Sequence, residues 1–271
     1  MTRTLANQTL LYDADCPLCR VYTKAFIDAG MLDENGKKPY CQLSPDEQHF
    51  IDVKRASNEI ALVDNINKTV IYGIDSLLKV IGFSYPWMEK VGNWQTVKFF
   101  LKKLYSFISY NRKVIIPSKI NNEIKLQCIP DFNYKYRFIY IVFAWLISSI
   151  VFCGFTKLLN LEKLSSSFIA TILLLQVPFQ CLFLLAFNKE KIINYAGNLI
   201  TISLFGGFIL MPIFILNQII TFNLSFNIIY LGATVAIMIY EHYRRILLLE
   251  LPEFLILIYV LTIFTSFYNL L

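Results

Sequence analysis

The fold of the first half of this 271-residue chain is decided by the stretch Gln8-Thr-Leu-Leu-Tyr-Asp-Ala-Asp-Cys-Pro-Leu-Cys-Arg20. Gln8–Asp13 is a short apolar run, which predicts a β-strand. Cys16–Ala29 has the pattern of a helix that ends at Gly30, a residue favoured just beyond helix C-termini. The two cysteines of the stretch are therefore expected at an exposed tip, where a strand passes into a helix.

The spacing Cys16-Pro17-Leu18-Cys19 predicts redox chemistry. A thiol at the start of a helix loses its proton more readily, because free N–H groups and the helix dipole stabilise the thiolate. Cys19 lies three residues later on the same helical face, close enough to form a disulfide with Cys16. Pro17 suits the first helical turn because its missing N–H needs no partner there. We expect the Cys16 thiolate to attack a substrate disulfide and Cys19 to resolve the mixed disulfide.

Three charged residues flank the cysteine pair. Arg20 follows Cys16 by one helical turn, where its positive charge would help to hold the thiolate. Asp13 and Asp15 precede the pair, and their negative charges would raise the pKa of Cys16.

The other cysteines show no paired spacing, which is unlike a disulfide-stapled scaffold. They are Cys41, Cys128, Cys153 and Cys181. Cys41 falls in a predicted strand and is expected to be a buried apolar thiol. The main alternative to redox chemistry is a zinc site made of Cys16, Cys19, Cys41 and His49. This set lacks a second closely spaced ligand pair, so we predict no metal and no cofactor.

The remaining elements of this half complete a β-α-β-α-β-β-α order. They are a strand at Lys38–Leu43, a helix at Ser44–Ala56, a hairpin of Glu59–Asp64 and Thr69–Tyr72, and a helix at Gly73–Ile81 stopped by Gly82. The order is that of a minimal thioredoxin-like α/β domain, with a mixed four-stranded sheet and helices on both faces.

An amphipathic helix is predicted at Trp94–Arg112. Its apolar face consists of Trp94, Val97, Leu101, Leu104 and Ile108. This face either packs on the domain or lies in a membrane interface.

Residues 8–116 resemble the DCC thiol-disulfide oxidoreductase family, which is named for its Asp-Cys-x-x-Cys motif. The resemblance rests on Tyr12-Asp-Ala-Asp-Cys-Pro-Leu-Cys-Arg20, on Val70-Ile-Tyr-Gly-Ile-Asp-Ser-Leu77 and on the Tyr…Asn-Arg pattern of Leu104–Arg112. It implies a thioredoxin-like fold and a redox activity centred on Cys16 and Cys19. The resemblance includes the flanking motif residues Asp13, Asp15 and Arg20 but assigns them no role.

The second half of the chain is too apolar for water. Residues 138–271 hold 6 of the 25 Lys and Arg residues and 5 of the 19 Asp and Glu residues. Five uncharged runs of about 17–21 residues are each long enough to cross a bilayer. They are Phe138–Phe155, Phe168–Phe187, Ala196–Leu216, Leu224–Tyr240 and Phe254–Leu271. We therefore predict an all-α transmembrane domain of about five spans.

The positive charges beside these runs predict an orientation. One side of the membrane receives ten of them: Arg112, Lys113, Lys119, Lys125, Lys135, Arg137, Lys189, Lys191, Arg244 and Arg245. The other side receives only Lys157 and Lys163. Because positive loops stay in the cytoplasm, the first half is predicted to be cytoplasmic. This placement also accounts for the basic excess without nucleic-acid binding.

The sequence thus predicts a thioredoxin-like domain at 1–116, a linker at 117–137 and a transmembrane domain at 138–271. The expected function is thiol-disulfide exchange on the cytoplasmic face of a multi-pass membrane protein. A protein or small-molecule disulfide or thiol would be the substrate, and the bilayer the other partner. Two alternatives stay open: an electron relay between the cysteine pair and a membrane quinone, and a non-catalytic scaffold that binds a partner. The oligomeric state is not predicted.

Overall fold

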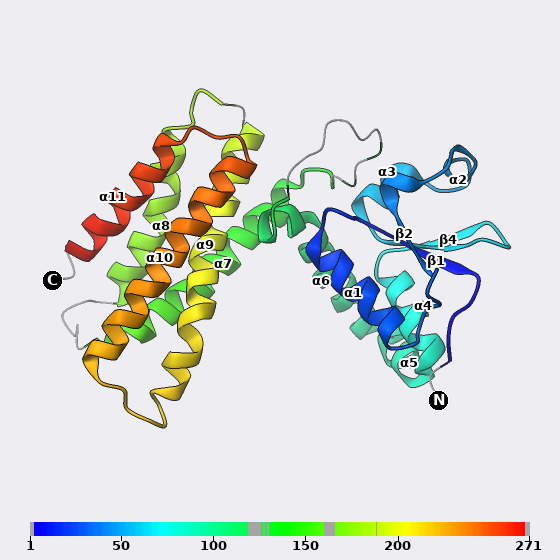
Figure 1. Ribbon diagram of the computed structural model, residues 1–271, viewed down its shortest axis with the longest axis horizontal. Helices are drawn as coiled ribbons and strands as arrows, with labels where there is room; N and C mark the ends of the chain where they lie inside the picture. Colours follow the sequence, from blue (N-terminus) through cyan, green and yellow to red (C-terminus); the bar gives the residue numbers. More distant parts are fainter. Residues whose placement is uncertain are drawn as a thin grey trace. The chain divides into compact units, whose positions relative to one another are not determined.

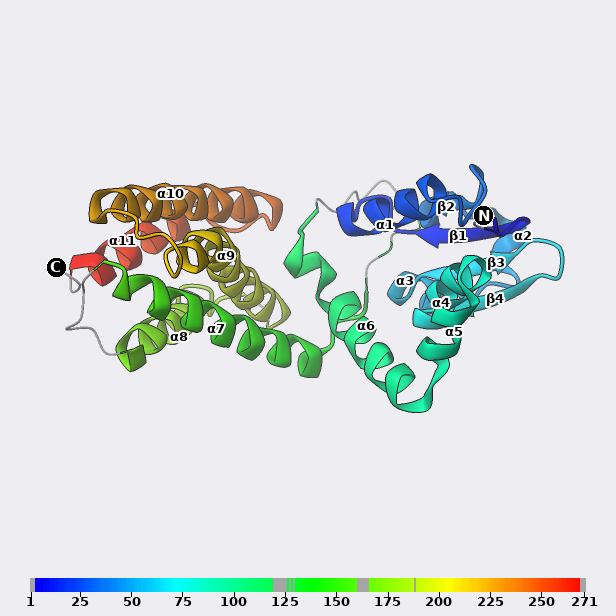
Figure 2. The ribbon, with the colours of Figure 1, turned by 90° about the horizontal axis from the view of Figure 1, so that it is seen from below.

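The computed structural model describes residues 3–118, 126, 128, 130–159, 166–187 and 189–268. The chain divides into two compact units, Met1–Tyr136 and Arg137–Leu271. Each unit is described by itself (Figures 1 and 2). The predicted linker at 117–137 falls partly outside the described residues, and its bounds stay a prediction.

The first unit is built on a mixed four-stranded sheet. Its strands are β1 (Gln8–Tyr12), β2 (Lys37–Pro39), β3 (Ala61–Asp64) and β4 (Thr69–Tyr72), in the order β2-β1-β3-β4. β1 pairs in parallel with β2 and antiparallel with β3, and β3 and β4 form an antiparallel hairpin. The predicted thioredoxin-like fold is confirmed.

Alternation along the strands creates an apolar layer on each face of the sheet. Leu10 and Leu62 point to the face that is covered by residues of α1 (Pro17–Asp28), α4 (Ile74–Ser84) and α6 (Gln95–Ile115). Their neighbours Leu11 and Ala61 point to the opposite face, which is covered by residues 40–56. Figure 1 shows α2 (Pro45–Gln48) and α3 (Val53–Asn58) on the other side of the sheet from α4. Burial on both faces holds β1, and hence the start of α1, in a fixed position.

Two of the predicted elements are shorter than expected. The strand expected at Lys38–Leu43 ends at Pro39, because proline cannot donate to a ladder, and Tyr40–Gln42 forms a 3₁₀ turn. The helix expected at Ser44–Ala56 is two helices, α2 and α3. Ser44 and Glu47 make the predicted capping box at the start of α2. Asp52 begins α3 by accepting a hydrogen bond from the backbone N–H of Arg55.

Gly82 does not stop α4, contrary to the prediction. The helix begins after Gly73, whose φ of 65° favours glycine, and continues to Ser84. Gly82 lies against Glu89 of α5 (Pro86–Asn93), where a Cβ atom would overlap the glutamate side chain. It therefore serves close helix packing rather than termination.

The face of α6 that packs on the domain is a polar stripe. Of the two alternatives for the predicted apolar face, packing on the domain is not borne out, and a place in a membrane interface stays a prediction. Trp94, Leu104 and Ile108 of the predicted apolar face are exposed. The Tyr105 hydroxyl instead accepts a hydrogen bond from the Ile60 backbone N–H at 2.8 Å. The Ser109 hydroxyl donates to the carbonyl of Asn58, and the Arg112 guanidinium donates to that of Ser57. The spacing 105, 109 and 112 places the three on one helical face.

The second unit is a bundle of five helices. They are α7 (Tyr134–Lys157), which begins in the first unit, α8 (Ser166–Leu182), α9 (Lys189–Leu216), α10 (Leu224–Leu248) and α11 (Phe254–Tyr268). In the described part of the chain, α7, α9 and α10 are long and apolar enough to cross a membrane, whereas α8 and α11 are shorter apolar helices. The all-helical membrane part is confirmed, but the count of five spans is not.

The helix α10 extends beyond the span that the sequence predicts. The run was expected to end at Tyr240 and give way to a charged loop, but the helix continues to Leu248. His242 and Arg245 are buried within the bundle, where Arg245 donates to Asn198 of α9 at 2.7 Å. Glu241 pairs with Arg244 and Arg245, as the spacing predicts.

Replacing Tyr105 with phenylalanine tests the role of the polar stripe. The buried Ile60 N–H would lose its acceptor, so we expect Tyr105→Phe to lower the free energy of unfolding by about 1–3 kcal/mol. The measurement is the urea dependence of Cys16 labelling in the full-length protein. Tyr134→Phe is the matched control because Tyr134 is half exposed. Equal midpoints for the two variants would contradict the assignment.

Candidate active site

Cys16 lies at the N-cap of α1, and Cys19 lies within the first turn of the helix. The backbone N–H of Cys16 donates to the carbonyl of Asp13 at 3.2 Å, and the carbonyl of Cys16 accepts the first helical bond from Arg20. Pro17 occupies the first helical position, as predicted. Local backbone geometry therefore places the two sulfur atoms on the same end of the helix. Cys16 and Cys19 are both thiols in this structure and are not joined in a disulfide.

Both thiols are buried, which corrects the expectation of an exposed tip. Cys16 is 2% exposed and Cys19 is 5% exposed. Their neighbours on the outer side of α1 remain accessible, because Leu18 and Val21 are 38% and 66% exposed. The outer side of the helix start is therefore accessible to solvent, whereas the Cys16 sulfur is not.

The pKa values of the two thiols are shifted in opposite directions. A hydrogen bond from the Cys19 thiol stabilises the Cys16 thiolate and, with the Cys19 backbone N–H, lowers the pKa of Cys16 to about 6 although burial opposes the shift. The same hydrogen bond and burial raise the pKa of Cys19 well above its ordinary value. Cys16 is therefore the more readily ionised thiol of the pair, and Cys19 the thiol that keeps its proton.

Charged groups beyond the pair adjust this balance. Asp13 raises the pKa of Cys16, as the sequence predicts, and Arg112 lowers it. Asp13 is buried, and its Oδ2 lies 3.7 Å from Arg112 Nε and 3.2 Å from Lys113 Nζ. Because the aspartate is paired with these two cations, the turn carries little uncompensated negative charge.

The other two charged residues of the motif point into solvent. Asp15 and Arg20 are both exposed. The guanidinium that acts on Cys16 comes from Arg112 of α6, whereas a role for Arg20 stays a prediction. Asp15 contributes through its backbone, since its N–H donates to the Asp13 carboxylate at 3.0 Å.

Cys128, which the sequence places in a linker, lies next to the same guanidinium. Arg112 Nη2 donates to the Cys128 carbonyl at 2.9 Å and lies 3.2 Å from its Sγ. The Cys128 thiol faces the carbonyl of Ser57 at 3.4 Å, and burial raises its pKa to about 11. This thiol is therefore protonated at neutral pH, in contrast to Cys16.

A small hollow of about 10 Å³ lies between the Asp13–Asp15 turn and Cys128. Cys41 also lines it, from the 3₁₀ turn rather than from a strand, and is only partly buried. The predicted fully buried strand thiol is therefore wrong. The hollow has room for about one water molecule.

The zinc alternative receives no geometric support in the described part of the chain. No group of three or more His, Cys, Asp and Glu side chains there is arranged to hold a metal ion. The chemistry available at the described site is that of a thiolate, a neighbouring thiol and a buried cation.

The sequence missed Arg112, Cys128 and Tyr22 as neighbours of the pair. Tyr22 lies one turn after Cys19 and interacts with its thiol. Its spacing on the helix was a usable signal. Arg112 was noted only as part of the Tyr…Asn-Arg pattern and as a positive charge, and nothing in the sequence indicated Cys128.

The region that contains the cysteine pair also matches a known protein family. Residues 10–116 match the model of the DCC1-like thiol-disulfide oxidoreductase family. The match covers the end of β1, the cysteine pair and all of α6, which contribute to the site. No curated protein and no solved structure matches the chain.

The pH dependence of Cys16 ionisation tests the thiol pair. We expect the thiolate to appear with a midpoint near pH 6. Cys19→Ala should move the midpoint up by at least about one unit because the thiolate loses its main donor, whereas Asp13→Asn should move it down. The measurement is the ultraviolet absorbance of the thiolate, taken as the difference from the Cys16→Ser variant.

Arg20→Gln serves as the matched control for this titration, since Arg20 is exposed. Its midpoint should stay close to that of the unmodified protein. A midpoint above pH 8 in the unmodified protein, or shifts of the same sign in Cys19→Ala and Asp13→Asn, would contradict the assigned electrostatics.

Proposed function

With residues 10–116 placed in the DCC1-like thiol-disulfide oxidoreductase family, we propose that the protein performs thiol-disulfide exchange with Cys16 and Cys19 while anchored in a membrane. The observation that carries the proposal is the hydrogen-bonded thiol pair at the start of α1, in which one pKa is lowered and the other raised. At pH 7 a pKa of about 6 leaves about ten thiolates for each thiol at Cys16.

The exchange takes two steps. The Cys16 thiolate attacks one sulfur of a substrate disulfide, forms a mixed disulfide and releases the other sulfur as a thiolate. Cys19 then loses its proton to solvent or to the departing thiolate and attacks the Cys16 sulfur. The Cys16–Cys19 disulfide forms, and the substrate leaves with two reduced sulfurs. The pair has lost two electrons and the substrate has gained them, so a thiol of the cell must later reduce the pair.

The surroundings of the pair favour a polypeptide or another substrate with an apolar surface. Leu18 and Val21 are exposed on α1 beside the buried thiols. Contact with these side chains would bring a disulfide to the helix start, and opening of the turn would uncover Cys16. Substrate binding and thiol exposure would thus be coupled.

The cytoplasmic placement of the first unit rests on the loop charges, ten positive against two. A multi-pass arrangement rests on the three long apolar helices α7, α9 and α10. In a reducing cytosol the pair would act as a reductant more readily than as an oxidant.

The second candidate function is an electron relay, in which a membrane quinol reduces the Cys16–Cys19 disulfide. Two electrons and two protons would pass from the quinol to the pair, which yields a quinone and two thiols. A specific observation favours this candidate: the second unit contains a pocket with polar groups inside its apolar helices. The non-catalytic scaffold is opposed by the lowered pKa of Cys16, which a binding module does not need.

Loss of disulfide reduction in Cys16→Ser tests the exchange. The full-length protein, reduced beforehand, should reduce a fluorogenic disulfide probe, and Cys16→Ser should lose that activity by a factor of about 100 or more because the nucleophile is gone. Cys19→Ser should accumulate a mixed disulfide at Cys16. Cys153→Ser is the control, since Cys153 lies in α7 of the other unit. Equal rates in Cys16→Ser and Cys153→Ser would support the scaffold instead.

The orientation is tested by labelling in intact cells. A cysteine introduced at the exposed Ile66 in the β3–β4 turn should be modified by a membrane-impermeant reagent only after the cells are permeabilised. Labelling of Ile66→Cys in intact cells would place the first unit outside. A cysteine introduced at Lys157, on the sparsely charged side, should show the opposite behaviour.

Reduction in liposomes tests the relay. We expect a short-chain quinol to reduce the Cys16–Cys19 disulfide of the reconstituted protein faster than it reduces the disulfide of a protein carrying Tyr259→Phe in the pocket. The redox state of the pair is measured by thiol trapping. Reduction by a cytosolic thiol at the same rate in both proteins is the control, and identical quinol rates would remove this candidate.

A further inference from the structure

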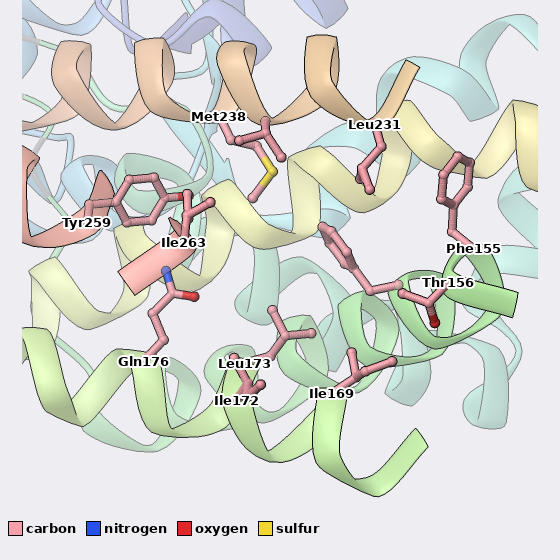
Figure 3. Close-up of a pocket in the computed structure, with 12 residues that line it drawn as sticks. Phe155, Thr156, Ile169, Ile172, Leu173, Gln176, Leu231, Met238, Tyr259 and Ile263 are labelled. Atoms are coloured by element: carbon pink, nitrogen blue, oxygen red, sulfur yellow. The ribbon is translucent and has the colours of Figure 1, made fainter. Parts of the chain in front are cut away.

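The second unit encloses a pocket between four of its helices, α7, α8, α10 and α11 (Figure 3). Its volume is about 100 Å³. Phe155 of α7 and Leu231 and Met238 of α10 form part of its apolar wall. The pocket is partly open, and its volume is smaller than the roughly 150 Å³ of an engineered apolar cavity that binds benzene, so a six-membered ring would lie partly in the pocket and partly in its mouth.

One end of the pocket is polar. Figure 3 shows Gln176 of α8 directing its amide nitrogen toward the part of the pocket that Tyr259 and Ile263 of α11 line. Tyr259 is fully buried. Within the described residues, Gln176 Nε2 and the Tyr259 hydroxyl each have no hydrogen-bond partner of normal geometry. The Gln176 amide lies within reach of the Tyr259 hydroxyl, and neither group donates to an acceptor with normal geometry among the described residues.

The surrounding side chains hold Tyr259 in this position. The His242 ring stacks on the Tyr259 ring at 4.2 Å between centroids, with 18° between the planes. His242 Nε2 lies 3.1 Å from the Tyr195 hydroxyl, which donates to Gln180 Oε1. The polar end is thus fixed by contacts from α8, α9 and α10, so its donors are preorganised.

The absence of an acceptor for these two groups indicates the chemistry of a molecule that would occupy the pocket. A buried donor without a partner costs about 1–3 kcal/mol, and a lipid acyl chain in the pocket would leave both donors unpaired. A water molecule needs two to four polar partners, whereas most of the pocket wall is apolar. A flat ring that carries a carbonyl oxygen satisfies the donors at one end and packs against Phe155 and Met238 along the wall.

We propose that this pocket binds the ring of a lipophilic carbonyl compound of the quinone class, with one carbonyl oxygen accepting hydrogen bonds from Gln176 Nε2 and the Tyr259 hydroxyl. The ring lies among the apolar side chains of α7, α8 and α10, and any tail leaves the pocket toward the lipid. The proposal concerns binding alone, so it holds whether or not the bound molecule exchanges electrons with the cysteine pair.

The test is binding of a short-chain benzoquinone to the full-length protein in lipid nanodiscs, followed by quenching of the intrinsic tryptophan fluorescence and confirmed by equilibrium dialysis. We expect saturable binding of one molecule per chain. Gln176→Leu and Tyr259→Phe should each weaken binding by about tenfold, because each removes one donor to the carbonyl. Both substitutions keep the volume of the pocket nearly unchanged.

Matched controls separate the pocket from general effects on the bundle. Gln218→Leu and Tyr240→Phe make the same chemical changes at exposed positions and should leave the dissociation constant unchanged. The double variant Cys16→Ser with Cys19→Ser should also bind normally, so a failure of the thiol chemistry would leave this result intact.

Three outcomes would overturn the proposal. Binding that does not saturate would show partition into lipid only. Equal dissociation constants for the pocket variants and their controls would show that the two donors are not used. Full competition by a fatty acid or by the ring hydrocarbon without carbonyl groups would show that the pocket selects apolar shape alone.

Discussion

The buried guanidinium of Arg112 is the interaction on which the first unit depends. It is 6% exposed and joins parts of the chain that are far apart in sequence. Its nitrogens donate to the carbonyls of Ser57 and Cys128, and its charge lies beside the carboxylate of Asp13. A buried charge is tolerated only where partners replace water, so α3, α6 and the β1–α1 turn must come together around it. The same charge lowers the pKa of Cys16, and one side chain therefore links the assembly of the domain to the reactivity of its thiol.

The thiol pair combines reactivity with protection. The hydrogen bond from Cys19 favours the thiolate of Cys16, but burial opposes it and keeps the sulfur from solvent. The result is a thiol whose pKa is lowered although it is only 2% exposed. Leu18 and Val21 are exposed on the outer side of the same helix.

In the second unit, polar side chains form hydrogen bonds between apolar helices. α9 is buried along its middle, between Tyr195 and Leu210, and Gly206 allows Met238 of α10 to approach closely. Tyr140 of α7 is bonded to Thr201 of α9, and Arg245 of α10 is bonded to Asn198 of α9. These bonds join helices whose outer surfaces are apolar, as expected where lipid offers no hydrogen bonds. Gln176 and Tyr259 depart from this pattern, since they lie near each other at the pocket and have no hydrogen bond of normal geometry to another helix.

Local physics explains which features the sequence could reveal. The strand before Cys16, the helix after it and the capping box of Ser44 and Glu47 each depend on residues within a few positions of one another. The apolar runs were equally visible, because crossing a bilayer requires length and composition rather than a partner. The mixed four-stranded sheet with helices on both faces followed from the order of the elements along the chain.

Tertiary structure alone decided what lies next to the thiols and which polar groups are buried. Arg112 is about a hundred residues from Asp13 in the chain. Hydrophobic periodicity did not reveal that a polar face of α6 packs on the domain, because it treats polar side chains as exposed. Gly82 was expected to stop α4. Its role instead depends on Glu89 of the next helix, which no local pattern indicates. The pocket at Gln176 needs four helices to exist. The sequence by itself determined the local helices and strands and the contrast between a polar first half and an apolar second half. Only packing between distant segments decided which groups surround Cys16 and which surround Gln176 and Tyr259, because burial depends on neighbours that no single segment contains.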